Sequence, residues 1–351
     1  MSTRALVISG GGSLGAWAVG ALRWLIEEQH EQFNWVVGTS TGALIAPMAA
    51  LGGIDVLRQV YTHANESAVL GSRLPWRGFL SNGIVGWIAG KDSIYTTAPL
   101  RRLIEQQITA ERFDRLRSDE DPAIPEVWVC AVNIHSGEKE FFSPRDAEMT
   151  RDKFIDCMIA SATIPILMSR TQIGDRPDSP WYIDGGIRDT VPLGKAIELG
   201  ATEMRVIILE PWSLPTTQPV DKIYDVAERT LMLMMQEIVD SDFALGKLIT
   251  RELAWRDRLR ATLKADYGFS DAMVEQLFAK VSGCDDPMKN DEREFHSVLF
   301  HVLRPPKELG SMIEFKPKVM SALEQKGYEE ASHGGNWVKI PQDLPQPVGE
   351  P

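Results

Sequence analysis

The stretch that most constrains the fold runs from Trp35 to Ile45, with the sequence WVVGTSTGALI. β-Favouring apolar residues lead into Gly-Thr-Ser-Thr-Gly, and a run rich in Ala, Leu, Ile and Met follows. This order predicts a strand, a sharp turn and a helix, with Ser40 at the turn. Such a turn exposes the hydroxyl and strains the backbone, so it needs small residues beside it, which are Gly38 and Gly42. The positive end of the helix dipole lies beside Ser40 and would stabilise an oxyanion there. The alternative is that Ser40 only caps a helix.

A second glycine motif precedes this turn. The apolar run Ala5–Ile8 predicts a buried parallel strand, and residues 16–28 have the pattern of a helix. Between them, Gly10, Gly12 and Gly15 match the pattern G-x-G-x-x-G. The chain therefore opens as strand, glycine loop, helix, strand, turn and helix, which predicts an α/β fold with a parallel sheet.

The glycine loop has three interpretations. A dinucleotide site needs an acidic residue about 20 residues on, at the end of the second strand. That strand ends in Val37-Gly38-Thr39-Ser40, without an acid, and no Gly-Lys-Ser/Thr follows the loop to make a phosphate-binding P-loop. The remaining functional use is to direct backbone N–H groups at an anion, such as the oxyanion of an acyl transfer. A tight turn without chemistry is the structural alternative.

Composition limits the class of protein. Hydrophobic residues make up 44% and charged residues 25% of 351, which is ordinary for a globular protein with a sizeable core. The net charge of −12 argues against nucleic acid as a partner and against a polybasic lipid anchor. Cys130, Cys157 and Cys284 are widely spaced, which favours reduced thiols over a disulfide framework or a metal site.

Neither a signal peptide nor a membrane span is predicted, because glycines from Gly10 interrupt the first apolar run and no uncharged apolar stretch reaches 18 residues. We therefore expect a cytoplasmic protein, with transient contact at a membrane surface left open. Residues 73–90 are rich in Gly, Trp and aliphatic residues. Their Trp76, Phe79 and Trp87 are candidates for contact with acyl chains or lipid, and packing of a small secondary core is the equal alternative.

A nucleophilic Ser40 needs a base that accepts its hydroxyl proton, and Asp184 is the stronger candidate. Trp181–Asp184 predicts a short strand that ends at an acid, at the position where active-site residues of parallel sheets gather, and Gly185 and Gly186 leave space around the carboxylate. A buried carboxylate within hydrogen-bond reach can accept the serine proton directly. Histidine is the alternative base, and four of the histidines that follow Ser40 lie in plausible places: His135, His296, His301 and His333. Only His333, in Ser-His-Gly-Gly, is retained as a weaker candidate.

The rest of the chain continues the alternation of strands and helices. We predict strands at 126–133, 140–143, 204–209 and 297–303, helices at 54–65, 97–107, 153–162, 193–199 and 316–326, and two helices within 221–263.

Four pieces in this order resemble the patatin-like phospholipases, a family of lipid acyl hydrolases. They are Gly10–Gly15, Gly38–Gly42, Ala160–Pro165, and Asp184-Gly185-Gly186 with Pro192 after it. The resemblance implies a Ser–Asp dyad, with Ser40 as nucleophile and Asp184 as base. It also implies an oxyanion hole formed by the backbone N–H groups of Gly11 and Gly12.

The fold that follows is a three-layer α/β/α fold with a mostly parallel central sheet and a helical C-terminal addition. We divide the chain into a patatin-like core (1–215), a helical insertion (216–290), a strand and helix that complete the core (291–340) and a Pro-rich tail (341–351). The reaction needs neither a metal nor an organic cofactor, and the substrate is a fatty acyl ester of a phospholipid or lysophospholipid.

Two positions depart from the family pattern, since Leu14 stands where a basic residue is usual and Thr190 where Asn is common. Backbone donors survive both changes, so we still expect activity. A thioesterase or general carboxylesterase with the same dyad remains open, as does a non-catalytic lipid-binding or regulatory protein on the same fold. A nucleotide-binding protein is a third alternative.

Overall fold

A computed structural model describes residues 3–69, 95–165, 167–174, 176–212, 223–282 and 298–340. The tryptophans and phenylalanine predicted to contact lipid within residues 73–90 lie outside these ranges, as do Cys284 and His296.

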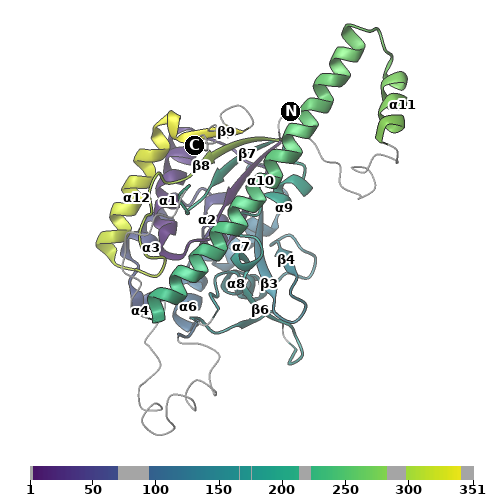
Figure 1. Cartoon of the computed structure of the whole chain (residues 1–351). Helices are drawn as coiled ribbons and strands as arrows, with labels where there is room; N and C mark the ends of the chain where they lie inside the picture. The colour runs from purple at the N-terminus through teal and green to yellow at the C-terminus, as the bar shows by residue number, and fades with distance from the viewer. Residues whose placement is uncertain are drawn as a thin grey trace.

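One sheet forms the centre of the molecule (Figure 1), with the described strands in the order β5-β6-β3-β2-β1-β7-β8-β9 and β4 paired to β3. Its middle is parallel and consists of β1 (Arg4–Ile8), β2 (Trp35–Thr39), β3 (Glu126–Asn133), β7 (Glu203–Ile207) and β8 (Leu299–Leu303). Antiparallel strands complete it: β4 (Lys139–Phe142), β5 (Thr171–Gln172), β6 (Trp181–Asp184) and β9 (Trp337–Ile340). The predicted α/β fold with a mostly parallel sheet is confirmed.

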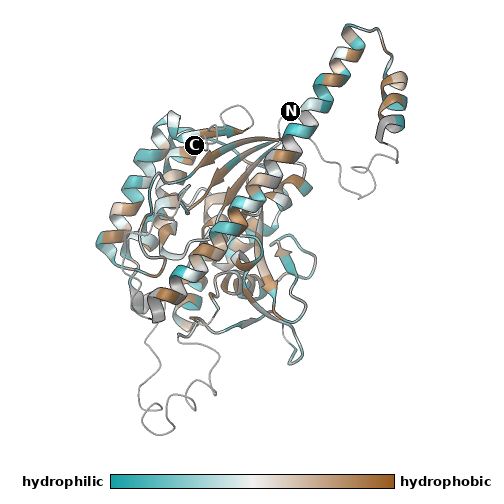
Figure 2. Ribbon diagram, in the orientation of Figure 1, coloured by the Kyte–Doolittle hydropathy of each residue, from teal (hydrophilic) through white to brown (hydrophobic). Residues whose placement is uncertain are grey.

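Two hydrophobic cores, one on each face of the sheet, make the three layers. Successive side chains of a strand point to opposite faces, so Leu6 and Ile8 belong to one core, whereas Ala5 and Val7 belong to the other. The strands are accordingly hydrophobic along most of their length, whereas hydrophilic and hydrophobic residues alternate along the outer helices α10 and α12 (Figure 2).

Most helices cover the Leu6 face. They are α1 (Gly15–Arg23), α2 (Thr41–Ala50), α3 (Ile54–His63), α4 (Glu66–Val69), α6 (Ala98–Gln107), α7 (Ala110–Arg117), α8 (Arg151–Ser161) and α12 (Pro317–Ser332). The opposite face is covered by α9 (Leu193–Glu198) and by Val239 and Phe243 of α10 (Ile223–Ala265), whereas Met232 and Met235 of α10 belong to the first core. Beyond the body, α10 continues into a projecting segment that also contains α11 (Asp271–Ser282) (Figure 1). Among the described residues, no helix is long and apolar enough to cross a membrane.

Some predicted elements need correction. The two helices predicted within 221–263 are one continuous helix, α10, of 43 residues. Its only interior glycine, Gly246, costs about 1 kcal/mol relative to alanine, and that is too little to break a long helix. The final helix extends to Ser332, and α7 and β9 were not predicted.

Helices α1 and α12 cross with their backbones in contact. A Cβ atom at Gly20 would overlap the carbonyl oxygen of Glu324, and one at Gly327 would overlap the carbonyl oxygen of Trp17. Both positions therefore require glycine, and the crossing fixes α1, the helix that follows the glycine loop.

Candidate active site

Ser40 lies between β2 and α2 with a backbone conformation that non-glycine residues rarely adopt, φ 55° and ψ −122°. Positive φ is unfavourable for a residue with a Cβ atom and is maintained only where its surroundings demand it. Here the surroundings are crowded, because a Cβ atom at Gly38 would overlap the carbonyl of Gly42, and one at Gly42 would overlap that of Ile8. The Ser40 side chain consequently stands at the carboxyl end of β2.

Asp184 lies beside it. The Ser40 hydroxyl donates a hydrogen bond of 2.7 Å to Asp184 Oδ2, and the Gly186 N–H donates one of 2.8 Å to Oδ1. A side chain at Gly185 would overlap the carbonyl of Cys130, so the turn after Asp184 can approach β3 only as glycine. Both oxygens of the carboxylate therefore have a fixed partner.

Asp184 was expected at the end of a parallel strand. The direction of that strand was predicted wrongly, although Asp184 does lie beside Ser40. β6 runs antiparallel to β3, and Asp184 pairs with Ala131. Asp184 nevertheless lies at the carboxyl ends of the parallel strands. The last residue of β3 that pairs with β2 is Cys130, opposite Thr39, and β3 continues from there to Asn133. β6 pairs with that extension, and its last residue points to the serine.

The motif Ala160–Pro165 holds both residues. Ser161 Oγ accepts a hydrogen bond of 3.0 Å from the Ser40 N–H, and the Thr163 carbonyl accepts one of 3.0 Å from the Asp184 N–H. The end of α8 thus fixes the serine and the aspartate relative to each other. The sequence motif marked this stretch, and the structure assigns it this positioning role.

Burial dominates the electrostatics of the site. Asp184 is 5% exposed, and removal of its carboxyl from water raises its pKa to about 7. The hydrogen bonds from Ser40 and Gly186 act in the opposite direction, because they stabilise the charged form. A carboxyl with a pKa near neutrality is ionised often enough to accept a proton and basic enough to use it.

Two glycines of the loop, Gly11 and Gly12, line the same small cavity as Ser40 and Asp184. Within the loop, the N–H groups of Gly10, Ser13 and Leu14 donate to carbonyl oxygens of Thr190, Met312 and Gly11. Among the described residues, the N–H groups of Gly11 and Gly12 have no acceptor. Both glycines have positive φ, 146° and 57°, and Leu209 and Met312 leave no room for a Cβ atom at either.

Residues far along the chain hold this loop in place. The Met312 carbonyl accepts a hydrogen bond of 2.7 Å from the Ser13 N–H, and the Ser311 carbonyl accepts one of 2.9 Å from Ser13 Oγ. Thr190 joins the two glycine turns, since its carbonyl accepts from Gly10 at 3.1 Å and its hydroxyl donates to the Gly186 carbonyl at 2.8 Å. Thr190 thus connects the loop to the Asp184 turn without an asparagine.

Two cavities open at Ser40. A small one contains Gly11, Gly12, Ser40 and Asp184 and is bordered by Met235 of α10. A larger one runs from Ser40 between α2, α3, α6 and α8, and its walls are apolar: Leu44, Met48, Leu57, Val60, Leu100, Leu103, Ile104, Met158, Ile164 and Phe315. Such a cavity suits a hydrocarbon chain whose polar end reaches the serine. Neither Met235 nor the cavity walls carried a signal in the sequence, since their roles follow from tertiary placement.

The histidines described lie elsewhere. His135 is in an exposed turn, His301 lies within β8 beside Glu203, and His333 caps α12 with Nδ1 2.6 Å from the Glu329 carbonyl. Leu14, at the position of the usual basic residue, is buried in the hydrophobic core. No group of three or more His, Cys, Asp or Glu among the described residues is arranged to hold a metal ion.

Comparisons with known proteins found one family and several relatives. The sequence model of the family described as Patatin-like phospholipase matches residues 6–197. The chain is 24% identical over 208 residues to the uncharacterized protein YjjU of Escherichia coli (strain K12). The aligned region covers 59% of this chain and 52% of YjjU. The chain thus spans about half the length of this curated relative.

Solved structures with distant similarity include two bacterial proteins. VipD from Legionella pneumophila aligns with a TM-score of 0.46 and 14% identity, over 97% of this chain and 68% of its own. ExoU, solved in complex with SpcU of the Pseudomonas aeruginosa type III secretion system, aligns with a TM-score of 0.37 and 15% identity, over 68% of this chain and 52% of its own.

Proposed function

The chain belongs to the patatin-like phospholipase family, and on that premise we propose that it is a serine acyl hydrolase of phospholipids or lysophospholipids. Family membership supports hydrolysis of lipids as the activity. The observation that carries the finer proposal is the 2.7 Å hydrogen bond from Ser40 to a buried Asp184, beside an apolar cavity and two N–H groups without an acceptor among the described residues.

The reaction uses each of these parts. Ser40 Oγ attacks the ester carbonyl, and Asp184 Oδ2 accepts the hydroxyl proton as the bond forms. The N–H groups of Gly11 and Gly12 donate to the oxyanion of the tetrahedral intermediate, where fixed donors stabilise charge without reorganisation. When the C–O bond breaks, Asp184 returns the proton to the leaving alcohol. Water then attacks the acyl-enzyme, with Asp184 again as base, and the fatty acid is released.

Each of the two cavities binds a different part of the substrate, the acyl chain in one and the alcohol side of the ester in the other. The large apolar cavity takes the acyl chain, because hydrocarbon gains about 25 cal/mol per Å² when it leaves water. The small cavity beside Asp184 receives the alcohol oxygen that the carboxyl must protonate. Met235 borders this second space, so it limits the room for the leaving group next to the ester.

Labelling by a fluorophosphonate probe tests the dyad, with Ser40→Ala and Asp184→Asn as variants and His333→Ala as the matched control for the alternative base. We expect the native protein to label at Ser40, both dyad variants to label poorly, and His333→Ala to label normally. Absence of labelling in the native protein, or undiminished labelling of Asp184→Asn, would contradict the dyad and favour a non-catalytic lipid-binding role.

A further inference from the structure

The most prominent feature outside the candidate site is a helical arm, defined as residues 246–282, which contains the second half of α10 and α11 (Figure 1). At 1.5 Å per residue, α10 alone runs about 30 Å from Gly246 to its end. The two helices pack against each other: Arg260 forms an ion pair of 3.0 Å with Glu275, and Arg256 and Arg260 lie over the ring of Phe278. The arm is thus a helical hairpin held by contacts between its two helices, and not a frayed helix end.

The arm exposes large apolar side chains. Among the described residues eleven large hydrophobic side chains are exposed, and five of them belong to the arm: Leu248, Trp255, Tyr267, Met273 and Leu277. Trp255 is 53% and Tyr267 69% exposed. Exposed large apolar side chains gathered on a projecting element point to an interaction surface.

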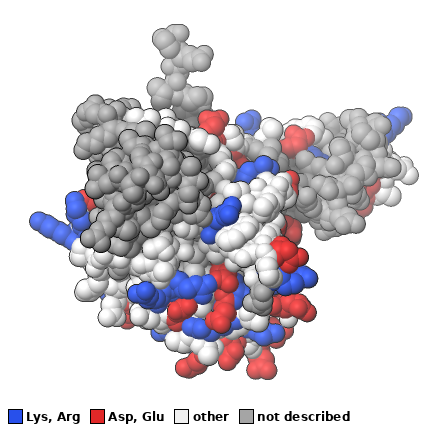
Figure 3. Space-filling model, turned by 90° about the horizontal axis from the view of Figure 1, so that it is seen from below, with Lys and Arg blue, Asp and Glu red and all other residues white. Residues whose placement is uncertain are grey.

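The charge of the arm differs from that of the chain. Residues 247–264 contain six basic residues, Lys247, Arg251, Arg256, Arg258, Arg260 and Lys264, and two acidic ones, Glu252 and Asp257, whereas the whole chain has a net charge of −12. On the face of the molecule seen in Figure 3, basic and acidic residues are interspersed. The excess of positive charge lies on the α10 part of the arm, because residues 265–282 contain one basic residue, Lys280, and three acidic ones, Asp266, Asp271 and Glu275.

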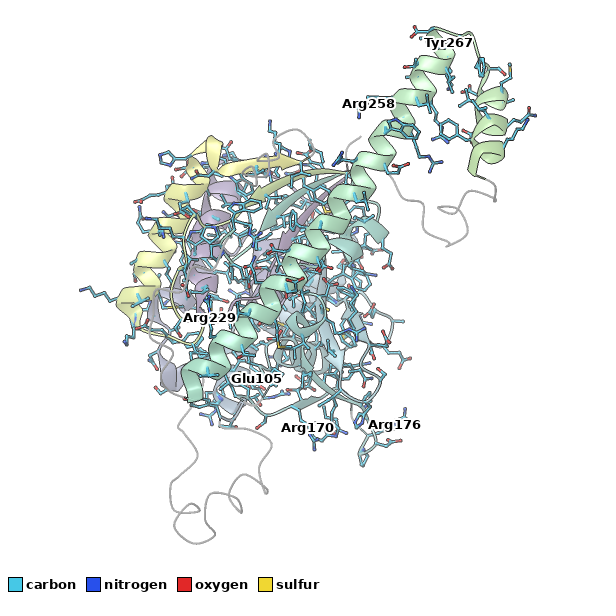
Figure 4. All side chains as sticks on the ribbon, in the orientation of Figure 1. Glu105, Arg170, Arg176, Arg229, Arg258 and Tyr267 are labelled. Carbon is cyan, nitrogen blue, oxygen red and sulfur yellow. The ribbon has the colours of Figure 1, made fainter. Side chains whose placement is uncertain are left out.

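Basic and apolar residues share one side of α10. Leu248, Arg251, Trp255, Arg258 and Thr262 follow one another at spacings of three and four residues, which places them on the same side of a helix. Figure 4 shows that Arg258 points away from α11 and that Tyr267 lies at the tip. This side is exposed in the structure, because Leu248, Arg251, Trp255 and Arg258 all have exposed side chains.

We propose that this side of the arm docks on an anionic phospholipid bilayer. Trp and Tyr have amphipathic rings that favour the boundary between headgroups and acyl chains, and arginines attract anionic headgroups. The proposal rests on the proposed function in one respect, since a hydrolase of membrane lipids must reach a bilayer. α10 joins the docking side to the dyad, because Met235 of the same helix borders the small cavity.

Sedimentation with vesicles tests the proposal. The probe is vesicles of phosphatidylcholine with phosphatidylserine, compared with phosphatidylcholine alone, and the protein carries Ser40→Ala so that hydrolysis cannot alter the bilayer. The test variants are Trp255→Ala and the double variant Arg251→Glu/Arg258→Glu. The matched control is Arg115→Glu/Arg176→Glu, which makes the same charge change at two exposed arginines of the body.

We expect binding to the anionic vesicles only, and a loss of at least about 25-fold in the arm double variant, since each basic residue near an anionic surface contributes about fivefold. Trp255→Ala is expected to weaken binding as well, and the body control to retain most of it. Equal loss in the body control, equal binding to both vesicle types, or an arm that instead mediates a dimer of this chain in analytical ultracentrifugation would overturn the proposal.

The two proposals fail in different ways. With Ser40 intact, the arm variants are expected to hydrolyse a soluble short-chain ester at the native rate. If no ester is hydrolysed, the proposed function fails while the vesicle result stands. If the ester is hydrolysed but no vesicle is bound, only the docking proposal fails.

Discussion

Truncation of Met235 to alanine is expected to shift the pH dependence of hydrolysis to lower pH. The terminal methyl of Met235 lies against Gly10 and Gly186 and borders the cavity that contains Asp184. Burial is the largest cause of the raised Asp184 pKa, so water admitted by the truncation should lower it. Because the base must be ionised, activity rises with pH through this pKa.

The magnitude follows from the pKa of about 7. In the native protein about one-tenth of Asp184 is ionised at about pH 6 and about nine-tenths at about pH 8, so kcat/KM should change nearly tenfold between them. If Met235→Ala lowers the pKa of Asp184 by one unit, the ionised fraction of Asp184 rises about tenfold at a pH well below that pKa. The activity at that pH, relative to the maximum of the same protein, should then rise about tenfold. The assay is kcat/KM for a soluble short-chain p-nitrophenyl ester across the pH range.

A second buried carboxyl provides the control. Glu210 also has a pKa raised to about 7 by burial, yet it lies outside both cavities. Glu210→Gln should therefore leave the midpoint of the profile unchanged. A native midpoint near the ordinary carboxyl pKa of about 4, or a midpoint that does not move in Met235→Ala, would refute the desolvation argument.

As pH rises, the contribution of Asp184 to the stability of the fold should fall, whereas activity should rise. The folded-state pKa of Asp184 lies above its unfolded value, so the folded protein binds more protons between about pH 4 and pH 7. This group therefore contributes stability at low pH that is lost as pH rises through that window. Asp184→Asn, which cannot ionise, should be more stable than the native protein at about pH 8, by roughly 1–4 kcal/mol in urea unfolding.

Two further substitutions test the loop and the large cavity. Gly12→Ala places a methyl group against the Met312 carbonyl at φ 57°, so it should displace the N–H donors and lower kcat by about 10²–10³, as measured by steady-state kinetics. Gly52→Ala, with φ 69° but open space around it, is the matched control and should cost stability of the order of 1 kcal/mol without loss of kcat. Ile104→Trp narrows the apolar cavity and should lower kcat/KM for long-chain esters at least about tenfold while short-chain esters react normally. A uniform loss across chain lengths would show that the cavity does not hold the acyl chain.

Local patterns in the sequence predicted most of the central sheet. The apolar runs that became β1, β2 and β3 are continuous, as expected of strands buried on both faces, whereas Arg205 interrupts the run that became β7. β9 was missed because only Trp337 and Ile340 of its four residues are buried.

The candidate site was predictable where a residue type is required by local geometry. Ser40 and the glycines beside it are fixed by a turn with positive φ, which a five-residue pattern reveals. The direction of β6 was not predictable, because strand pairing is a long-range property. Nor were the contacts of Met235 and of the Met312 carbonyl, since neither a methionine side chain nor a backbone oxygen has a local signature.

The hydrogen bond between Ser13 and Ser311 has a consequence for the time at which the enzyme becomes active during its synthesis. These residues are 298 positions apart, so a ribosome that adds about 5–20 residues per second makes the second roughly 15–60 s after the first. Until then the glycine loop lacks the carbonyl oxygens of Ser311 and Met312, which accept from Ser13, although Ser40, Asp184 and Thr190 have already been made. A nascent chain can therefore assemble the proposed nucleophile and base before it can fully order the proposed oxyanion donors. The proposed hydrolase activity is therefore expected to appear on the ribosome only after Ser311 and Met312 have been made.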